Sequence, residues 1–578
     1  MKFGKLELDP AVNPGVLDTE TWAPAAAWQQ VSSADFDWNR LNNGGDESTS
    51  ILATRQLQIW RGSMARRNDT AWCLATPGDG QSLLCCVGSN SRRDLLPLGA
   101  IGQRELRPGQ WLTAYPADAA NVDRYCREIV PAKGPRALGA TPRLGIGTRM
   151  TTQVWPGIFD AMDSRHMAAN SIQNSIRELS LLDDLREARP PEMNYSTGIG
   201  TIEVGWTGST YEGLWLAGTL AALKSPLSLT YGADADHIQV KRGPAGLERA
   251  RRVIRAARYY SFFTLDMADL LDYAALNTLT SAEAEGFLTQ KLSDPATRRE
   301  FVEYHLQPFR VRGERCQMDA ATVGRLVGKY WDTLEAVGEL AAYIASLKQG
   351  VPYDLELTID EHPPEVAAFD CLTSNEELLF LAREIERREL PITHLAPNFG
   401  QEKGYDYRAP DGLAGLELRV HEQFEIAEFF GLMLDVHSGD DLQRPTRQVF
   451  GRATQGKLHF KVSPMLQLIY ARLLCEHHNE LFRRWWQDAF DYASREAAKG
   501  SPVAISCLAE RADNSRRQPS PHDKVFHCYS FPFVGRRDVE GQFLHRHEFY
   551  ELSSKFCAAY QQAVRDWLCD VADDVFNP

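Results

Sequence analysis

Acidic residues and histidines recur at the ends of short apolar segments in the second half of this 578-residue chain. Imidazole and carboxylate groups are the ligands that many divalent metal ions prefer, and they also act as general acids and bases. If the fold gathers these segment ends in one place, the sequence predicts a metal site with acid–base groups beside it. The clusters are Asp234 to His237, Asp266, Asp360 to His362, His394 with Glu402 and Lys403, and His437 to Asp441.

Two further side chains belong to the same pattern. His459 and Lys461 alternate along an apolar segment, so on a β-strand they point to one face. Each residue also has a simpler interpretation, because Asp after a strand often caps a helix and a lone His is often a hydrogen-bonded core residue. Capping alone does not explain why His237, His437 and His459 all fall at or beside the ends of different strands. The combined pattern therefore favours a metal site.

The segments that carry these residues alternate between strand and helix patterns, which is typical of parallel β/α architecture. We expect strands at 144–150, 228–234, 261–267, 353–360, 392–396, 431–438 and 457–463, with 503–508 as an eighth. Helical spacing of apolar residues marks 164–185, 243–259, 281–305, 317–348, 374–389, 415–430 and 464–497. Seven or eight such units predict an α/β fold, a (β/α)8 TIM-like barrel in which all strand ends meet at one rim.

The sequence also predicts segments outside the basic barrel. Residues 1–135 alternate short apolar runs with turn residues and predict an N-terminal β-rich lobe, and a Pro- and Gly-rich stretch at 131–142 reads as a linker. The catalytic barrel is then expected over 141–578. Within it, about 275–350 is too long for one crossover and predicts a helical insertion, and a C-terminal extension follows the last strand.

Composition narrows the class of protein. A net charge of -14 has the wrong sign for a protein whose main partner is nucleic acid. No apolar run is long enough to span a membrane, and the first residues lack the apolar stretch of a signal peptide. The 11 cysteines form no CxxC pair, as expected for reduced thiols. We therefore expect a cytoplasmic protein without a membrane partner, and a homo-oligomer remains open.

The order of six motifs resembles the tagaturonate epimerase family over roughly residues 140–570. Ser175 to Leu179 also resembles a helix of that family, whereas the N-terminal lobe contributes little to the similarity. The combination is far more specific than any single motif. The six motifs are Gly232 to His237, Phe262 to Asp266, Ile359 to Glu361, Leu395 to Tyr407, Val436 to Asp441 and Gly456 to Lys461.

The resemblance implies a metal-dependent enzyme that inverts one hydroxyl-bearing carbon of a keto-hexuronate, a small keto-sugar acid of the tagaturonate and fructuronate type. It implies Asp236 as proton acceptor and Glu361 as the opposing donor. His237 and His437 would be metal ligands, with Glu402 or His459 completing the sphere. The metal would be a divalent cation of the Zn, Mn, Fe or Ni class. The residues implied to hold the substrate's carboxylate and hydroxyls are Arg177, Lys403, Asp441 and Lys461.

A retro-aldol route suits this reaction, because the inverted carbon is not adjacent to the ketone and its hydrogen is not acidic. One base removes the hydroxyl proton, the neighbouring carbon–carbon bond breaks, the aldehyde rotates, and the bond forms again. A metal ion stabilises the enediolate that forms. The route needs no nicotinamide, which agrees with the lack of a complete dinucleotide-binding motif in the sequence.

The sequence departs from the family pattern near the predicted rim, at 147–156, at Asn398 and at 462–465. The substrate could therefore be another keto-sugar, a keto-uronate derivative or a longer acid. Two alternative functions remain: another metal-dependent keto-sugar isomerase or aldolase, and a catalytically silent sugar-binding barrel.

Overall fold

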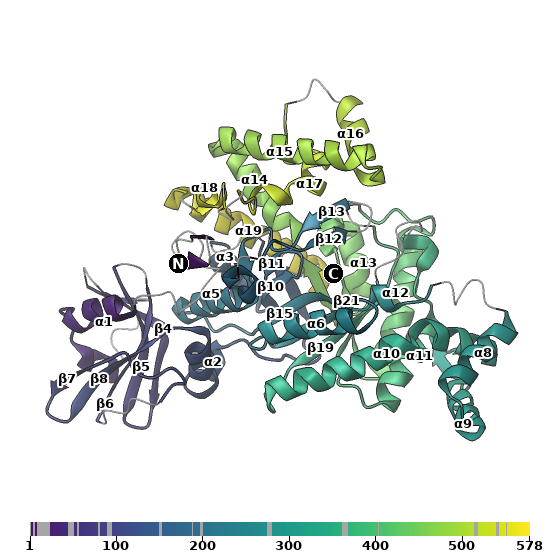
Figure 1. Cartoon of the computed structure of the whole chain (residues 1–578), viewed down its shortest axis with the longest axis horizontal. Coiled ribbons are helices and arrows are strands. Elements are labelled where there is room, and N and C mark those ends of the chain that lie inside the picture. Colours follow the sequence, from purple (N-terminus) through teal and green to yellow (C-terminus); the bar gives the residue numbers. More distant parts are fainter. Residues whose placement is uncertain are drawn as a thin grey trace.

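A closed barrel of parallel strands forms the centre of the protein in the computed structural model (Figure 1). Its strands pair in the order β9, β10, β15, β16, β19, β20, β21, β22 and back to β9. The structure describes residues 2–3, 6–7, 24–43, 51–54, 57–78, 81–89, 95–149, 153–187, 189–196, 200–273, 280–360, 368–402, 404–513, 518–538, 543–550 and 552–577. The (β/α)8 fold predicted from the sequence is confirmed.

Seven of the eight barrel strands lie within or overlap the segments expected from the sequence. The strands are β9 (Arg143–Gly147), β10 (Ala168–Ser175), β15 (Tyr231–Gln239), β16 (Phe262–Asp266), β19 (Asp354–Thr358), β20 (His394–Ala396), β21 (Met433–Val436) and β22 (His459–Val462).

The eighth strand was assigned wrongly. Residues 503–508 belong to helix α16 (Pro502–Asp513), and the missing strand is β10, which the sequence pattern placed in a helix. Every residue of β10 is buried, yet five of the eight are polar, including Asn170, Gln173 and Asn174. Strands inside a barrel can point polar side chains inward, so β10 lacks the apolar run by which a buried strand is usually recognised.

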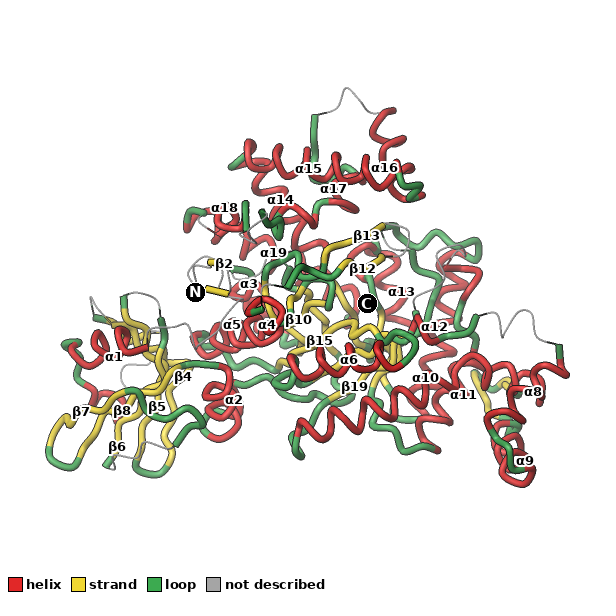
Figure 2. The backbone as a smooth tube through the Cα atoms, in the orientation of Figure 1, coloured by secondary structure: helices red, strands yellow, loops and turns green. Residues whose placement is uncertain are grey.

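Helices surround the barrel, as the tube in Figure 2 shows. They bury an apolar face on the strands, and side-chain caps such as Thr210 and Ser374 begin several of them. Helix α19, near the C-terminus, packs against α3 and α13 and so completes the ring. These outer helices are α3 (Trp155–Arg165), α5 (Tyr211–Lys224), α6 (Pro244–Ala256), α10 (Ala320–Lys348), α11 (Asn375–Arg387), α12 (Gly412–Phe429), α13 (Arg444–Ala453) and α19 (Ser554–Phe576).

The described residues of 51–116 form a separate antiparallel sheet at the left of Figure 1, in the order β3-β4-β5-β6-β8-β7, whereas β1 and β2 pair only with each other. It meets the barrel at α5, where a Cβ on Gly62 would lie 1.9 Å from the carbonyl oxygen of Ser225, so only glycine fits. The division of the chain near residue 140 stays a prediction. The elements are β1 (Lys2–Phe3), β2 (Leu6–Glu7), α1 (Pro24–Ser33), η2 (Trp38–Asn43), β3 (Ile51–Ala53), β4 (Leu57–Arg67), β5 (Thr70–Pro77), β6 (Leu83–Gly88), β7 (Gly102–Arg107), β8 (Gln110–Pro116), α2 (Ala119–Glu128) and η3 (Pro131–Lys133).

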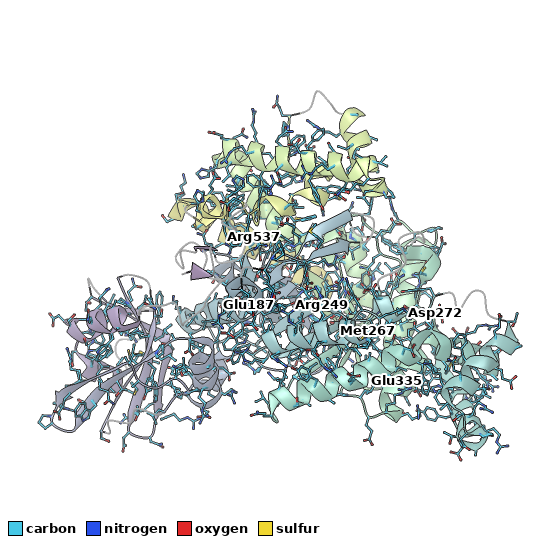
Figure 3. The ribbon with its side chains drawn as sticks, in the orientation of Figure 1. Glu187, Arg249, Met267, Asp272, Glu335 and Arg537 are labelled. Atoms are coloured by element: carbon cyan, nitrogen blue, oxygen red, sulfur yellow. The ribbon has the colours of Figure 1, made fainter. Side chains whose placement is uncertain are left out.

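Additional elements follow two of the barrel strands. After β16 the chain passes Met267 and Asp272, labelled in Figure 3, and reaches two helices that pack against the long helix α10, which carries Glu335. After β10 it forms a small hairpin. These elements are α8 (Ser281–Lys291), α9 (Pro295–His305), β17 (Phe309–Val311), β18 (Glu314–Cys316) and η4 (Ala268–Leu270), and β11 (Leu179–Ser180), α4 (Leu182–Arg186), β12 (Met193–Ser196), β13 (Gly200–Glu203) and β14 (Ser209–Thr210).

The C-terminal helices gather above the barrel in Figure 1, in yellow-green and yellow. Trp485 of α15 is fully buried among Phe526 and Phe549, so this group has its own aromatic packing. None of the helices in the described residues is both long and apolar enough to cross a membrane. The remaining elements are η5 (Ala368–Cys371), η6 (Gly439–Asp441), α14 (Pro464–His477), α15 (Asn479–Ala498), α17 (Lys524–Tyr529), η7 (Phe531–Phe533) and α18 (Arg546–Tyr550).

Candidate active site

A cavity of about 240 Å³ opens where the carboxyl ends of the barrel strands meet the C-terminal helices. Its floor and walls include Asp236, His237, His437 and Lys461 from the barrel, and residues 527–528 and Phe531 from the segment above it. In a (β/α)8 barrel this is the end at which catalytic residues gather, because every strand points its last side chains there. The structure thus brings these four barrel residues, which are far apart in the sequence, to one cavity.

Local distortions of the backbone orient several side chains towards the cavity. Successive residues of a regular strand face opposite sides, yet Asp236 and His237 both line the cavity. A bulge in β15, between Ala235 and Ile238 of the pairing with β16, makes this possible. His237 and Ser438 both have left-handed backbone angles, with φ of 50° and 55°. Strained backbone of this kind is concentrated at functional sites.

Lys461 lies at the centre of a buried cluster of carboxylates. Its ammonium is 2.9 Å from Asp236 and 2.7 Å from Glu356, and it also donates to Thr264 at 2.8 Å. Two further carboxylates, Asp234 and Asp435, approach it at 3.2 and 3.6 Å. One buried cation therefore faces four buried or nearly buried acids. Such a group is stable only if protons or another cation neutralise the surplus negative charge.

The pKa values of the acids reflect this surplus. Burial raises the pKa of Asp234 to about 7, and its acidic neighbours add to the effect although Lys461 opposes it. Burial likewise raises the pKa of Asp435 well above its usual value. Burial also disfavours ionisation of Asp236, but Lys461 and the two nearby imidazoles outweigh it and lower the pKa of Asp236 to about 2. At neutral pH Asp236 is therefore ionised and ready to accept a hydrogen bond from a substrate hydroxyl.

His237 and His437 face each other across the cavity floor, with ring centroids 4.8 Å apart. Nδ1 of His237 contacts Asp266 at 3.4 Å, and Nε2 of His437 contacts Glu356 at 2.8 Å, so carboxylates orient both rings. Burial alone would lower the pKa of His437, but Asp360 and Glu356 raise it well above the usual value.

Nδ1 of His437 and the carboxylate of Asp360 are donor atoms of the kind that bind a divalent cation. Nδ1 of His437 lies 3.1 Å from Oδ2 of Asp360, yet in the described part of the chain it makes no hydrogen bond of normal geometry. An imidazole nitrogen and a carboxylate that converge without such a bond, next to a second imidazole held by a carboxylate, are donor types that known metal sites use.

A second set of ligand atoms lies deeper in the barrel. Glu356, Asp435 and His459 bring three donor atoms within 4.8 Å of one another, and all three side chains are fully buried. His459 contacts Asp435 at 2.6 Å, and burial with the nearby cations lowers its pKa well below the usual value. The ammonium of Lys461 already occupies this neighbourhood, which disfavours a further cation there.

Other residues expected at the site take different places. Arg177 lines the cavity. Glu402 does not; it forms an ion pair with Arg408 at the surface. Asp441 lies behind the wall, where it accepts from the backbone of Gly404 at 2.7 Å and contacts His527 at 3.2 Å. The two predictions for Glu361 and Lys403 lie outside the described residues.

Several residues of the site were not singled out from the sequence. Glu356 and Asp435 sit inside short apolar strands, and the signal that could have found them is their alternation with Thr358 and His437 on the inward face. Arg149 lines the cavity just beyond β9. His527 and its neighbour Cys528 also line it, and their segment carries no motif that links it to the barrel.

Comparisons with known proteins agree with this architecture. The native crystal structure of fructuronate-tagaturonate epimerase UxaE from Cohnella laeviribosi has a TM-score of 0.64 and 21% identity, covering 91% of this chain and 98% of that one. Its complex with one glycerol has the same TM-score and 20% identity, covering 96% and 99%. At this identity the two structures establish the fold alone, and a search of curated protein sequences finds no significant match.

The family follows from the sequence model of UxaE, described as tagaturonate epimerase, which matches residues 201–570 and so more than half of the chain. The matched region contains both facing histidines, the central lysine and the carboxylates around it. With the barrel, the convergent acids and this match taken together, the chain belongs to the tagaturonate epimerase family.

Proposed function

We propose that this protein is a metal-dependent epimerase that interconverts tagaturonate and fructuronate, or a closely similar pair of keto-hexuronates, by a retro-aldol route. Membership of the family supports the reaction class. The observation that carries the proposal is the set of groups at the cavity floor, in which an ionised Asp236 lies beside two imidazoles and a buried lysine.

His237 and His437 would hold the metal, with the carboxylate of Asp360 beside them. Bound there, a divalent cation would act as a Lewis acid that polarises substrate oxygens and stabilises negative charge. Asp266 contacts Nδ1 of His237 and Glu356 contacts Nε2 of His437, so one nitrogen of each ring is held by a carboxylate. This carboxylate support is what orients metal-binding histidines in known sites.

Asp236 is the proposed acceptor of the substrate's hydroxyl proton. Its pKa of about 2 makes it a weak base, so it can act only on a hydroxyl whose acidity is increased in the site. The ammonium of Lys461 holds Asp236 at 2.9 Å and keeps it ionised. As the proton leaves, the alkoxide becomes an aldehyde, and the electron pair of the broken carbon–carbon bond passes to the ketone-bearing fragment as an enediolate, whose charge a bound cation would stabilise. Rotation of the aldehyde and re-formation of the bond then give the epimer.

The decisive experiment is incubation of the purified protein with tagaturonate and with neutral keto-hexoses, with Mn or Zn added, followed by NMR in deuterated water. We expect fructuronate to form and the inverted carbon to keep its own hydrogen, since a retro-aldol step does not exchange it. Deuterium at that carbon would instead indicate direct deprotonation.

A variant tests the role of the acid. Asp236→Asn should lower kcat by roughly 10²- to 10⁴-fold with little change in metal content, because it removes proton transfer and not coordination. Asp332→Asn, at an exposed ion pair with Lys291, is the matched control and should leave kcat unchanged. Two released fragments would favour an aldolase, and sugar binding without turnover in the unaltered protein would favour a silent barrel.

A further inference from the structure

The cavity is rich in cations, but most of them already have anionic partners at close range. Lys461 is surrounded by four carboxylates. His237 and His437 contact acids on the barrel strands, and His527 contacts Asp441 at 3.2 Å. A substrate that carries its own carboxylate needs a cationic group that is not saturated in this way, because an anion gains little from a cation that is already neutralised.

Arg149 has looser anionic partners than these groups: Glu178, which forms an ion pair with it, and Asp440, whose pKa burial raises and the charge of Arg149 partly lowers. Its Nε donates to the hydroxyl of Ser463 at 2.8 Å, and its Nη2 lies 3.3 Å from Glu178, longer than the usual contact of a charge-assisted hydrogen bond. That contact is made to Oε1 of Glu178, whereas Oε2 accepts from the backbone N–H of Ser175 at 2.8 Å. Within the described residues, Nη1 of Arg149 has no hydrogen-bond partner.

The guanidinium is also held in a fixed orientation. It lies over the ring of Trp206, with 5.6 Å between the guanidinium carbon and the ring centroid. The backbone of Arg149 is left-handed, with φ of 35°, and its N–H donates to Asn174 at 3.1 Å. A strained residue held by several contacts beside a cavity is a preorganised one, and preorganisation reduces the entropy lost when a ligand binds.

The position of Arg149 suits a six-carbon acid. Its partner Ser463 follows Lys461 by two residues, which at the usual rise of a strand is about 7 Å. The guanidinium therefore lies about this distance above the cavity floor. Asp236 and the histidines converge at that floor. A carboxylate separated from the reacting carbons by a few bonds can reach this height while the hydroxyls stay at the floor.

We infer that Arg149, held by Ser463, Glu178 and Trp206, is the residue that binds the carboxylate of the substrate and so selects uronates over neutral sugars. The inference rests on the proposed function only for the identity of the substrate. Arginine suits this role because its planar fork can match both oxygens of a carboxylate.

The test uses Arg149→Met and Arg149→Lys, with Arg165→Met as matched control, because Arg165 pairs with Asp573 on the outer surface. Two measurements are made: steady-state kinetics with tagaturonate, and calorimetric binding of D-glucuronate and of glucose, which lack the keto group. Arg149→Met should raise KM for tagaturonate roughly 10- to 100-fold with a small change in kcat, because a hydrogen bond to a charged group is lost. It should weaken glucuronate binding by a similar factor.

The other variants sharpen the result. Arg149→Lys keeps the charge but not the fork, so it should raise KM by less, and Arg165→Met should have no effect. If Arg149→Met does not fold, an unchanged KM in Arg149→Lys overturns the inference. It is also overturned if glucose and glucuronate binding weaken equally, or if Arg177→Met carries the whole effect on KM. Binding of glucuronate that depends on Arg149, without any epimerase turnover, would uphold the subsite and reject the proposed function.

Discussion

Two parts of this protein bury several ionised side chains, and they do so in different ways. Where α10 packs on α11, Glu377 meets Lys329 at 2.5 Å and the hydroxyl of Tyr330 at 2.8 Å. Next to it, Glu384 is held by Arg387 at 2.6 Å and Arg388 at 2.8 Å. Each acid there has at least one cation of its own. At the cavity floor, a single lysine, Lys461, forms ion pairs with four acids.

The ratio of cations to acids differs between the two regions, and this difference changes the pKa values of their carboxylates. Burial disfavours ionisation of Glu384, but hydrogen bonds from Arg387, His305 and Arg388 outweigh it and lower its pKa to about 2. Burial raises the pKa of Asp234 to about 7 in the unbalanced cluster.

In the balanced cluster, around Glu377 and Glu384, every acid has a cationic partner, so the cluster stabilises the packing of the helices. In the unbalanced cluster, around Lys461, some acids have no cation of their own and can exchange protons or bind a further cation. Acids with shifted pKa values of this kind are typical of catalytic sites.

The largest effect is expected from Lys461→Met. It leaves four buried acids without their cation, so we expect a loss of about 3–5 kcal/mol in the free energy of unfolding and at least a roughly 10³-fold loss of turnover. Urea denaturation and NMR assays measure the two. Lys457→Met, at an exposed pair with Glu428 just before the same strand, is the control and should cost about 0.5 kcal/mol or less. Equal stability of the two variants would contradict the charge imbalance.

A second pair of variants tests which cluster binds metal. His237→Ala and His437→Ala should each lose the divalent ion, with affinity falling roughly 100-fold or more, because each removes a proposed ligand. Plasma mass spectrometry of the dialysed proteins measures the metal content. His305→Ala, which removes a histidine that contacts Glu384 at 3.0 Å in the balanced cluster, should retain it. Retention by both cavity variants and loss in His459→Ala would move the metal to the deeper triad.

The smallest effect concerns the balanced cluster and its pH dependence. The pKa of Glu384 is lower in the folded protein than in the unfolded chain, so its ionisation stabilises the fold above about pH 4.5, and this contribution is lost as the pH falls towards 2. Glu384→Gln should therefore cost about 2–3 kcal/mol at pH 7 and less at pH 3. Turnover per folded molecule should not change. Glu386→Gln, on the same helix at an exposed contact with Tyr304, is the control; a pH-independent difference would argue against the ionic role of Glu384.

The site was only partly predictable from the sequence. Asp236, His237, His437 and Lys461 are visible because they stand at strand ends in an ordered series of motifs, and the structure brings them to one cavity. Glu402 looked equivalent to them in the sequence. Its side chain instead pairs with Arg408 at the surface, although the preceding residue Gln401 still lines the cavity.

The amino-acid sequence by itself determined the fold class, the family and those chemistry-bearing residues that stand at strand ends, since strand and helix periodicities and motif order are local properties of the chain. Only the tertiary structure decided which groups share charge and which line the cavity. The bulge that turns both Asp236 and His237 inward arises from pairing with a neighbouring strand. The contact of Arg149 with Ser463 joins residues 314 positions apart. Burial and charge balance depend on such distant neighbours, and no local pattern in the sequence encodes them.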